Sequence, residues 1–426
     1  DVNRRFTDTP AFELRGFATN GPDAFTKRDL TTYNLSFDHR FNRIFSLRAS
    51  ANYYERSIDR YGYSANRYVP DLRQIITRTA NLRNQSNESA GAQVDFLSNF
   101  WTGKIEHKFL VTLDYSKLET IDLVRAINRN DPELGVPWRE LNVDDPVYAP
   151  LFPEELFNRT NRDTFSDIET TGLFISEQMA FWEGKWIILL GGRFDQVDFD
   201  LRDNRTDNEN IYSVTDTTYM VGSNFDLTPG LTLYANTSTS FLPQNNLQDD
   251  GSPFPNENGK GYELGFKSTL FENRFNFTTG VFDIVRNNVV RRNPDPRVGG
   301  FVLTGEETTK GFEFDFNFTI SRSLTLTGGY AYLDAKFTNA PDDPGLEGLP
   351  LQRAPRHQGG IAARYWFRDG PLKGMRLTAG VQHFGETLVD IGRPDDDRRN
   401  YRQDGYTTLD LGGSYGWRTH NRRLIH

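Results

Sequence analysis

Hydrophobic and polar residues alternate strictly in KGFEFDFNFTI, residues 310–320. The even positions carry Phe312, Phe314, Phe316 and Phe318, and the odd positions carry small, polar or acidic residues. Successive side chains of a β-strand point to opposite faces of the sheet, so this segment predicts a strand with one apolar and one polar face. The apolar face could pack on a protein core, as in a soluble sandwich, or on lipid, as in an outer-membrane barrel.

The same period of two recurs along most of the chain, and no segment shows a sustained 3.6-residue period. We therefore predict an all-β fold of roughly sixteen antiparallel strands, the first near residues 11–20 and the last ending at Trp417. Further examples of the pattern are KIEHKFLVTLDY (104–115), LTLYANTSTSF (231–241), GYELGFKSTLF (261–271), MRLTAGVQHF (375–384) and TTLDLGGSYGW (407–417).

The connections between these segments alternate in length. Short ones are expected at 41–42, 100–103, 182–185, 227–230, 271–273, 320–323 and 368–374. Long polar stretches lie at 58–72, 120–165, 203–212, 242–258, 292–299, 339–352 and 392–405. Tight turns at one end and long loops at the other are typical of outer-membrane barrels, whose short turns are periplasmic. This alternation favours lipid as the neighbour of the apolar face. Aromatic residues near the strand ends are consistent with the interfacial girdles of such barrels.

Composition agrees with this interpretation and narrows the function. The 426 residues have a mean hydropathy of -0.63, which does not exclude a barrel, because barrel strands need only one apolar residue in two. The net charge of -9 and the lack of a Lys/Arg-rich run argue against a nucleic-acid partner. The chain has 0 cysteines and lacks the H-E-x-x-H, G-x-S-x-G and P-loop signatures, so we predict that it is not an enzyme.

Six segments carry a family resemblance. They are GKIEHKFLVTLDY (103–115), KWIILLGGRFD (185–195), KGYELGFKSTLFENRFNFTTGVFDIVRNNVV (260–290), TGEETTKGFEFDFNFTISRSLTLTGGYAYLDAKF (304–337), APRHQGGIAARYWF (354–367) and GYTTLDLGGSYGW (405–417). In them the sequence resembles the barrel of TonB-dependent outer-membrane receptors, most closely the ferric-siderophore branch. The resemblance implies an antiparallel transmembrane β-barrel of the large type, with about 22 strands when complete. Residues 1–426 are then expected to form one partial barrel domain, without the N-terminal plug, the first strands and the last strands.

The resemblance also implies a function. It predicts TonB-energised uptake of a ferric siderophore across the outer membrane of a Gram-negative bacterium, with outer-membrane lipid around the barrel. TonB and its inner-membrane, proton-driven complex would act through the plug, and no covalently bound cofactor is expected. Two alternatives stay open: the same family with another cargo, such as cobalamin, haem, another metal chelate or a glycan, and a passive outer-membrane porin.

The long loops supply the candidate binding residues. Ferric siderophores are bulky and often anionic or aromatic, so a site for them would combine aromatic surfaces with arginine donors. The candidates are Trp138, Arg139, Tyr148, Phe152, Gln244, Phe254, Arg291 and Arg292. The acidic stretches PDDPG (341–345) and RPDDDRRN (393–400) follow no EF-hand pattern, so we interpret them as solvated loops and predict no metal site.

Overall fold

The structure is a computed structural model that describes residues 20–69, 74–127, 140–142, 144–148, 151–248, 250–293, 300–303, 305–341, 343–389, 402–418 and 424–425. Its strands are β1 (Phe25–Arg40), β2 (Phe45–Val69), β3 (Gln74–Thr102), β4 (Ile105–Ala126), β5 (Leu141–Asn142), β6 (Arg159–Phe181), β7 (Trp186–Asp203), β8 (Asn208–Thr228), β9 (Leu231–Leu242), β10 (Glu257–Leu270), β11 (Phe275–Asn287), β12 (Val290–Arg292), β13 (Phe301–Leu303), β14 (Glu306–Thr319), β15 (Leu324–Asn339), β16 (His357–Trp366), β17 (Met375–Phe384), β18 (Thr387–Leu388), β19 (Arg402–Gln403), β20 (Tyr406–Tyr415), β21 (Trp417–Arg418) and β22 (Leu424–Ile425). Within the described residues, helix is limited to the 3-10 turns η5 (Glu154–Leu156), η6 (Trp182–Gly184) and η7 (Pro344–Leu346). None of these is long and apolar enough to cross a membrane.

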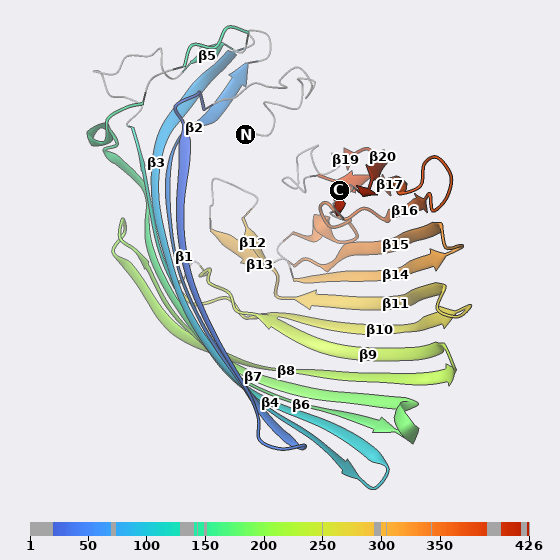
Figure 1. The fold of residues 1–426 in the computed structure, drawn as a ribbon. Helices are drawn as coiled ribbons and strands as arrows, with labels where there is room; N and C mark the ends of the chain where they lie inside the picture. Colours follow the sequence, from blue (N-terminus) through green and yellow to red (C-terminus); the bar gives the residue numbers. More distant parts are fainter. Residues whose placement is uncertain are drawn as a thin grey trace.

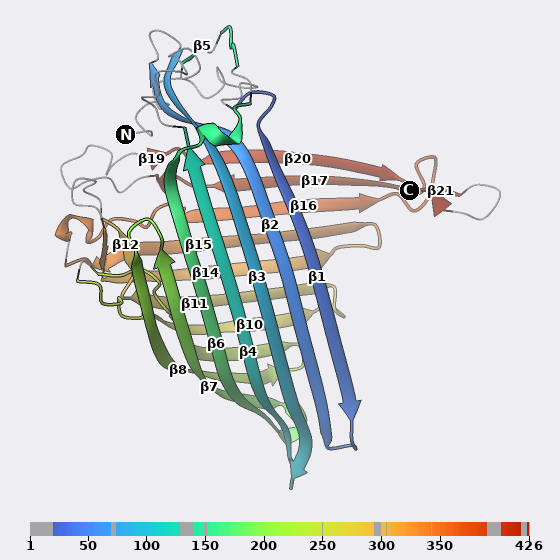
Figure 2. The ribbon, with the colours of Figure 1, turned by 90° about the vertical axis from the view of Figure 1, so that its left-hand side faces the viewer.

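One large antiparallel sheet contains almost all of the long strands. It has 16 strands in the order β1-β2-β3-β4-β6-β7-β8-β9-β10-β11-β14-β15-β16-β17-β20, with β5 paired to β3. Each long strand therefore pairs with its neighbour in sequence, which confirms the predicted all-β, antiparallel fold. The sheet curls strongly, so that β1–β8 and β9–β20 form two facing walls, while β1 and β20 lie apart (Figure 1). Figure 2 shows the twist between the walls, with β1–β4 crossing steeply in front of β14–β20.

The short connections lie where the sequence predicts them. The turn between β8 and β9 illustrates why it is tight: Gly230 has a φ of +91°, and a Cβ at this position would lie 2.3 Å from the carbonyl oxygen of Thr269. Only glycine fits this position without displacing the neighbouring hairpin. Apart from the turn at 204–207, the tight turns that the structure describes lie at one rim of the sheet, which is the periplasmic rim in a barrel of this architecture.

Two of the predicted long loops are wrong. Residues 58–69 continue β2, and residues 208–212 begin β8 after a tight turn at 204–207. Polar side chains there pair across the strands, as when Arg202 of β7 contacts Glu209 of β8 at 2.9 Å, so polar sequence does not end the strand. The strands reach 29 residues in β3, whereas about 9–11 cross a bilayer. The walls of β2–β8 therefore extend well beyond the membrane on the loop side.

The first and last predicted strands also need comment. The strand predicted near residues 11–20 falls on residues of which the structure describes only Asn20. The last long strand, β20, ends at Tyr415, and Trp417 belongs to the two-residue strand β21.

The register gives every strand one apolar and one polar face. Phe316 lies opposite Phe277, and Phe318 opposite Phe275, with ring centroids of Phe275 and Phe318 5.2 Å apart. On this apolar face large side chains are exposed, as Leu113 (58%) and Leu411 (76%) show. Polar residues of the other face, listed here, are buried among one another: Asp95, Thr112, Asp122 and Asp195. The polar face is therefore the crowded concave side, and the apolar face points outward.

The outward face carries a continuous apolar band. On β4 it runs from Ile105 to Tyr115 and gives way to the charged Lys117, which contacts Asp167 at 2.6 Å. The one acidic side chain that the described register places inside this band is Glu177, whose Oε1 lies 2.7 Å from Nδ1 of His107. An exposed apolar belt of this extent, bounded by tyrosine and then by charge, is the surface that a bilayer covers.

Substitutions of the neighbouring residues Phe314, which faces outward, and Asp315, which faces inward, test whether the outward face meets lipid. We expect Phe314→Arg to destabilise the folded protein by roughly 2–4 kcal/mol, because the guanidinium would enter hydrocarbon. Asp315→Asn, the matched control, should leave stability nearly unchanged. Urea unfolding of the full-length protein in lipid vesicles measures both, and the opposite ranking of the two variants would reverse the two faces.

Candidate functional site

Of the eight residues predicted from the loops, the structure describes six, and it does not bring these six together. Trp138 and Arg139 lie outside the described residues. Phe152 packs against a buried cluster that includes Tyr61 and Tyr63, and its backbone N–H donates to the Tyr61 hydroxyl at 3.3 Å. The register of β2 places both tyrosines on the outward face, so Phe152 packs on the outside of the extended wall. The side chain of Tyr148 lies against Gly21.

The other four candidates lie on the β8–β15 side. Gln244 and Phe254 are buried, and the backbone carbonyl of Gln244 accepts a hydrogen bond from the Tyr212 hydroxyl at 2.8 Å. Arg291 contacts Asp343 at 3.2 Å. Arg292, its neighbour in β12, is exposed. Gln244 and Phe254 are buried within their loop, and Arg291 is paired. Arg292 is therefore the candidate of this group most accessible to solvent.

The register reveals a basic row that the sequence analysis missed. Arg60 lies opposite Arg83, Arg83 opposite Val124, and Val124 opposite Arg162, on the inward face of β2, β3, β4 and β6. These side chains line a pocket of about 290 Å³ together with Asn81 and Asn161, among others. The pocket lies in the extended wall, on the loop side of the apolar band. We refer to Arg60, Arg83, Arg162 and Asp122 as the arginine row.

Asp122 is the acid that holds this row together. Both of its oxygens accept from Arg83, at 2.7 and 2.8 Å, and Arg162 donates to Oδ2 at 2.7 Å. The Asp122 side chain is 8% exposed and that of Arg162 54%. Burial favours the neutral acid, but the hydrogen bonds from Arg83 and then Arg162 outweigh it, so that the pKa of Asp122 is lowered.

The arginine row has the chemistry of an anion site. Three arginines and one aspartate leave a formal charge of 3 - 1 = +2. Arg60 is exposed and makes no ion pair with any described residue, and Arg162 has donors left beyond the one that Asp122 uses. A planar guanidinium fork matches the two oxygens of a carboxylate. Like charges opposite one another destabilise a sheet, and Asp122 neutralises only one of the three arginines. A bound anion would therefore reduce the repulsion that remains among Arg60, Arg83 and Arg162.

A second charged group lies at the loop end of the facing wall. Arg286 contacts Glu257 at 2.6 Å and Glu307 at 3.1 Å. Burial is the main cause of the raised pKa of Glu307, and Arg286 opposes it. One arginine and two glutamates leave a formal charge of 1 - 2 = -1 here, so this group offers no free cation to an anionic ligand.

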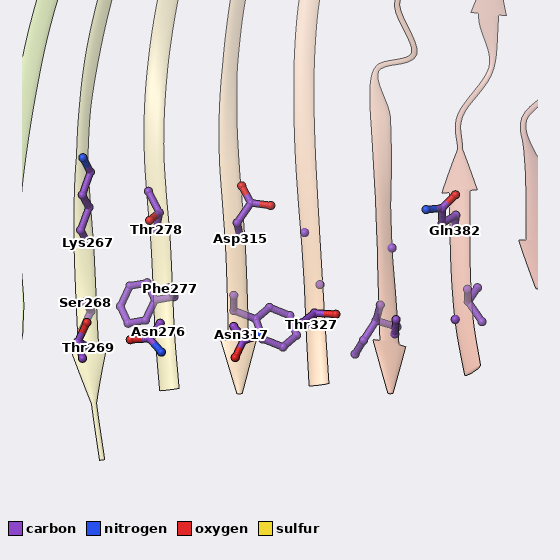
Figure 3. Close-up of a pocket in the computed structure, with 18 of the residues that line it drawn as sticks. Lys267, Ser268, Thr269, Asn276, Phe277, Thr278, Asp315, Asn317, Thr327 and Gln382 are labelled. Atoms are coloured by element: carbon purple, nitrogen blue, oxygen red, sulfur yellow. The ribbon is translucent and has the colours of Figure 1, made fainter. Parts of the chain in front are cut away.

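A hollow larger than the arginine-row pocket lies elsewhere, on the inward face near the tight turns. It measures about 830 Å³. Figure 3 shows Lys267, Thr278, Asp315 and Gln382 at similar heights on its strands. The register inserts Gly329 and Gly360 between Asp315 and Gln382, so the hollow exists because two strands carry no side chain there. It forms a smooth trough rather than a cluster of converging groups.

The structure also bears on a metal site. In the described parts of the chain, no group of three or more histidine, aspartate or glutamate side chains is arranged to hold a metal ion.

Comparison with known proteins points to one family. A family model described as TonB dependent receptor-like, beta-barrel matches residues 1–424. The metal-pseudopaline receptor CntO of Pseudomonas aeruginosa is 30% identical over 392 residues, which cover 90% of this chain and 52% of that protein. The ferrichrome outer membrane transporter/phage receptor of Escherichia coli is 26% identical over 401 residues, covering 88% and 50%. The chain thus spans about half the length of these relatives.

Solved structures share the fold. The ferric preacinetobactin receptor BauA of Acinetobacter baumannii superposes with a TM-score of 0.76 at 20% identity, covering 92% of this chain and 57% of that one. The ferric-catecholate import receptor Fiu of Escherichia coli gives a TM-score of 0.75 at 18% identity, covering 93% and 59%.

The lowered pKa of Asp122 predicts an acid-dependent contribution to stability. Its carboxylate stabilises the wall above its usual pKa of 3.8, and this contribution is lost as the pH falls through the lower pKa of the folded state. Asp122→Asn should therefore have a lower Tm than the wild type near neutral pH, and the difference should shrink as the pH falls below 3.8 and vanish once the pH is below the lowered pKa of the folded state. Asp315→Asn serves as the control. A difference between Asp122→Asn and wild type that does not change with pH would contradict the ion-pair account.

Proposed function

The chain belongs to the TonB-dependent receptor β-barrel family, and we propose that it serves in TonB-energised uptake of an anionic metal chelate, such as a carboxylate-bearing siderophore. The barrel lies in the Gram-negative outer membrane, and its family consists of transporters rather than enzymes. The observation that carries the proposal is the arginine row, which leaves positive charge on the inward face beyond the apolar band.

The ligands for which the relatives are named support a chelate as cargo. They are receptors for metal-pseudopaline, ferrichrome and ferrioxamine B. The identities of 30%, 26% and 25% leave the individual chelate open. The charge of the arginine row narrows the range of possible cargoes, because a formal charge of +2 favours an anionic ligand over a neutral glycan.

The proposed sequence of events starts at the loop side. A chelate entering the mouth would meet Arg60 and Arg162, whose forks pair with its carboxylates while Asp122 keeps Arg83 in place. Since two charge-assisted contacts form on a preorganised wall, little ordering cost accompanies binding. The trough near the tight turns (Figure 3) offers a smooth surface for a plug domain, on which TonB would act.

Removal of the free charges tests the cargo. We expect Arg60→Gln and Arg162→Gln each to weaken binding of a carboxylate chelate by roughly ten- to hundredfold, the effect of losing a hydrogen bond between charged groups. Binding to the full-length purified receptor measures this with a panel of ferric and other metal chelates, both carboxylate and neutral. Arg274→Gln, in the exposed turn between β10 and β11, is the matched control.

Growth assays test the uptake proposal separately from the assigned binding site. Under metal starvation, a strain lacking the protein should grow poorly on at least one chelate of the panel and recover with the wild-type chain. Equal growth of the deletion strain and its parent on every chelate would overturn the uptake proposal. Recovery by both arginine variants on carboxylate chelates would overturn the assigned site and leave the uptake proposal standing.

A further inference from the structure

The outward face of β8–β11 contains a groove that the uptake function does not use. It measures about 600 Å³ and is lined almost entirely by apolar surface, with Val221, Ala235, Leu264 and Val281 among its residues. Leu264 is 50% exposed and Val281 51%. The groove opens on the apolar band, so the groups that meet it in a bilayer are lipid acyl chains.

Small side chains create this groove. The register aligns Ser223, Ala235, Leu264 and Val281 across β8, β9, β10 and β11. The walls on either side carry bulkier residues: Leu190 on β7 lies opposite Val221, and Phe312 on β14 lies opposite Val281. Two neighbouring strands with Ser223 and Ala235 therefore leave a depression between larger side chains.

A positive charge lies at the loop-side end of the groove. Tyr262 lines that end, and the Lys260 ammonium lies 5.1 Å from the centroid of the Tyr262 ring. Lys260 is exposed and forms no ion pair with any residue that the structure describes. Lys310 lies close to the groove's acidic residue Asp283, with Nζ and Oδ2 2.8 Å apart, and neutralises it. The groove thus combines an apolar trough with one available cation at the extracellular boundary.

The opposite half of the same outward surface has the reverse charge. Just above the band, the register places acids directly opposite one another on five neighbouring strands, β2, β3, β4, β6 and β7. These residues are Glu55, Glu88, Glu119, Asp167 and Asp200. Lys117 and Arg202 pair with Asp167 and Asp200, whereas Glu55, Glu88 and Glu119 form no ion pair within the described residues. An anionic headgroup is repelled there and attracted to the Lys260 side.

We propose that the β8–β11 groove binds an acyl chain of a phosphorylated glycolipid of the outer leaflet, with its phosphate paired to Lys260. The occupant follows from three features: an apolar groove facing the bilayer, its position at the extracellular end of the strands, and a cation where the headgroup begins. A glycolipid held there would be a fixed neighbour of the barrel rather than an exchanging one.

Binding of diphosphorylated lipid A to the delipidated full-length receptor tests the proposal, with native mass spectrometry as the readout. Lys260→Gln removes the charge and should weaken binding by about tenfold, the loss of one charge-assisted contact. Ala235→Phe fills the groove without a change in charge and should weaken binding as well. Lys27→Gln, on the outward face of the acidic half, is the matched control and should bind like the wild type.

Two further arms separate the groove from ordinary surrounding lipid. Dephosphorylated lipid A should bind the wild type and Lys260→Gln equally, and phosphatidylglycerol should bind more weakly than lipid A. Ser223→Leu repeats the filling test if Ala235→Phe fails to fold, which the heat-dependent gel mobility of the barrel reports. Equal lipid A binding by wild type, Lys260→Gln and a folded groove-filling variant would overturn the proposal, as would an equal loss in Lys27→Gln.

Discussion

The strand-to-strand hydrogen-bond ladder is the constraint on which the rest of this structure depends. Hydrocarbon offers no partner to a backbone N–H or C=O, so each strand that crosses it must be paired on both sides. Antiparallel pairing between sequence neighbours meets this demand with the shortest connections, and it fixes the register from β1 to β20. Because the side-chain period is two, the register then decides which residues meet lipid and which meet the interior.

The same ladder continues past the membrane and organises charge on both faces of the extended walls. Glu119 and Asp122 lie three residues apart on β4 and face opposite ways. Asp122 points inward and joins Arg83 and Arg162, whereas Glu119 points outward in line with Glu88 and Asp167. One strand therefore contributes to a basic pocket inside and to an acidic surface outside. Two different electrostatic surfaces arise from one alternating sequence.

Local pattern predicted the fold but not the site. Alternation in segments such as 310–320 is visible in the sequence because each residue's face depends only on its own parity. The tight turns are visible for a similar reason, since turn residues such as Pro229 and Gly230 act locally. Arg60, Arg83 and Arg162 are far apart in sequence, and only the register brings them into one row. The polar content of 58–72 was misleading because residues 58–69 are held as strand by backbone pairing with β3, which the sequence of β2 alone does not reveal. Loop residues such as Phe152 were chosen by chemical type, which does not say on which side of the wall a loop packs.

The central claim is that one face of each strand meets lipid and the other meets the interior. Because the chain has 0 cysteines, single cysteines at successive positions of 310–320 can each carry a nitroxide label. Collision with oxygen, which concentrates in hydrocarbon, and with a water-soluble nickel chelate then reports the surroundings of every position in the full-length protein in vesicles. We predict that oxygen access peaks at the even positions, with Phe314 and Phe316 highest, and that nickel access peaks at Asp315 and Asn317. Collision profiles without a period of two, or with the two phases exchanged, would contradict it.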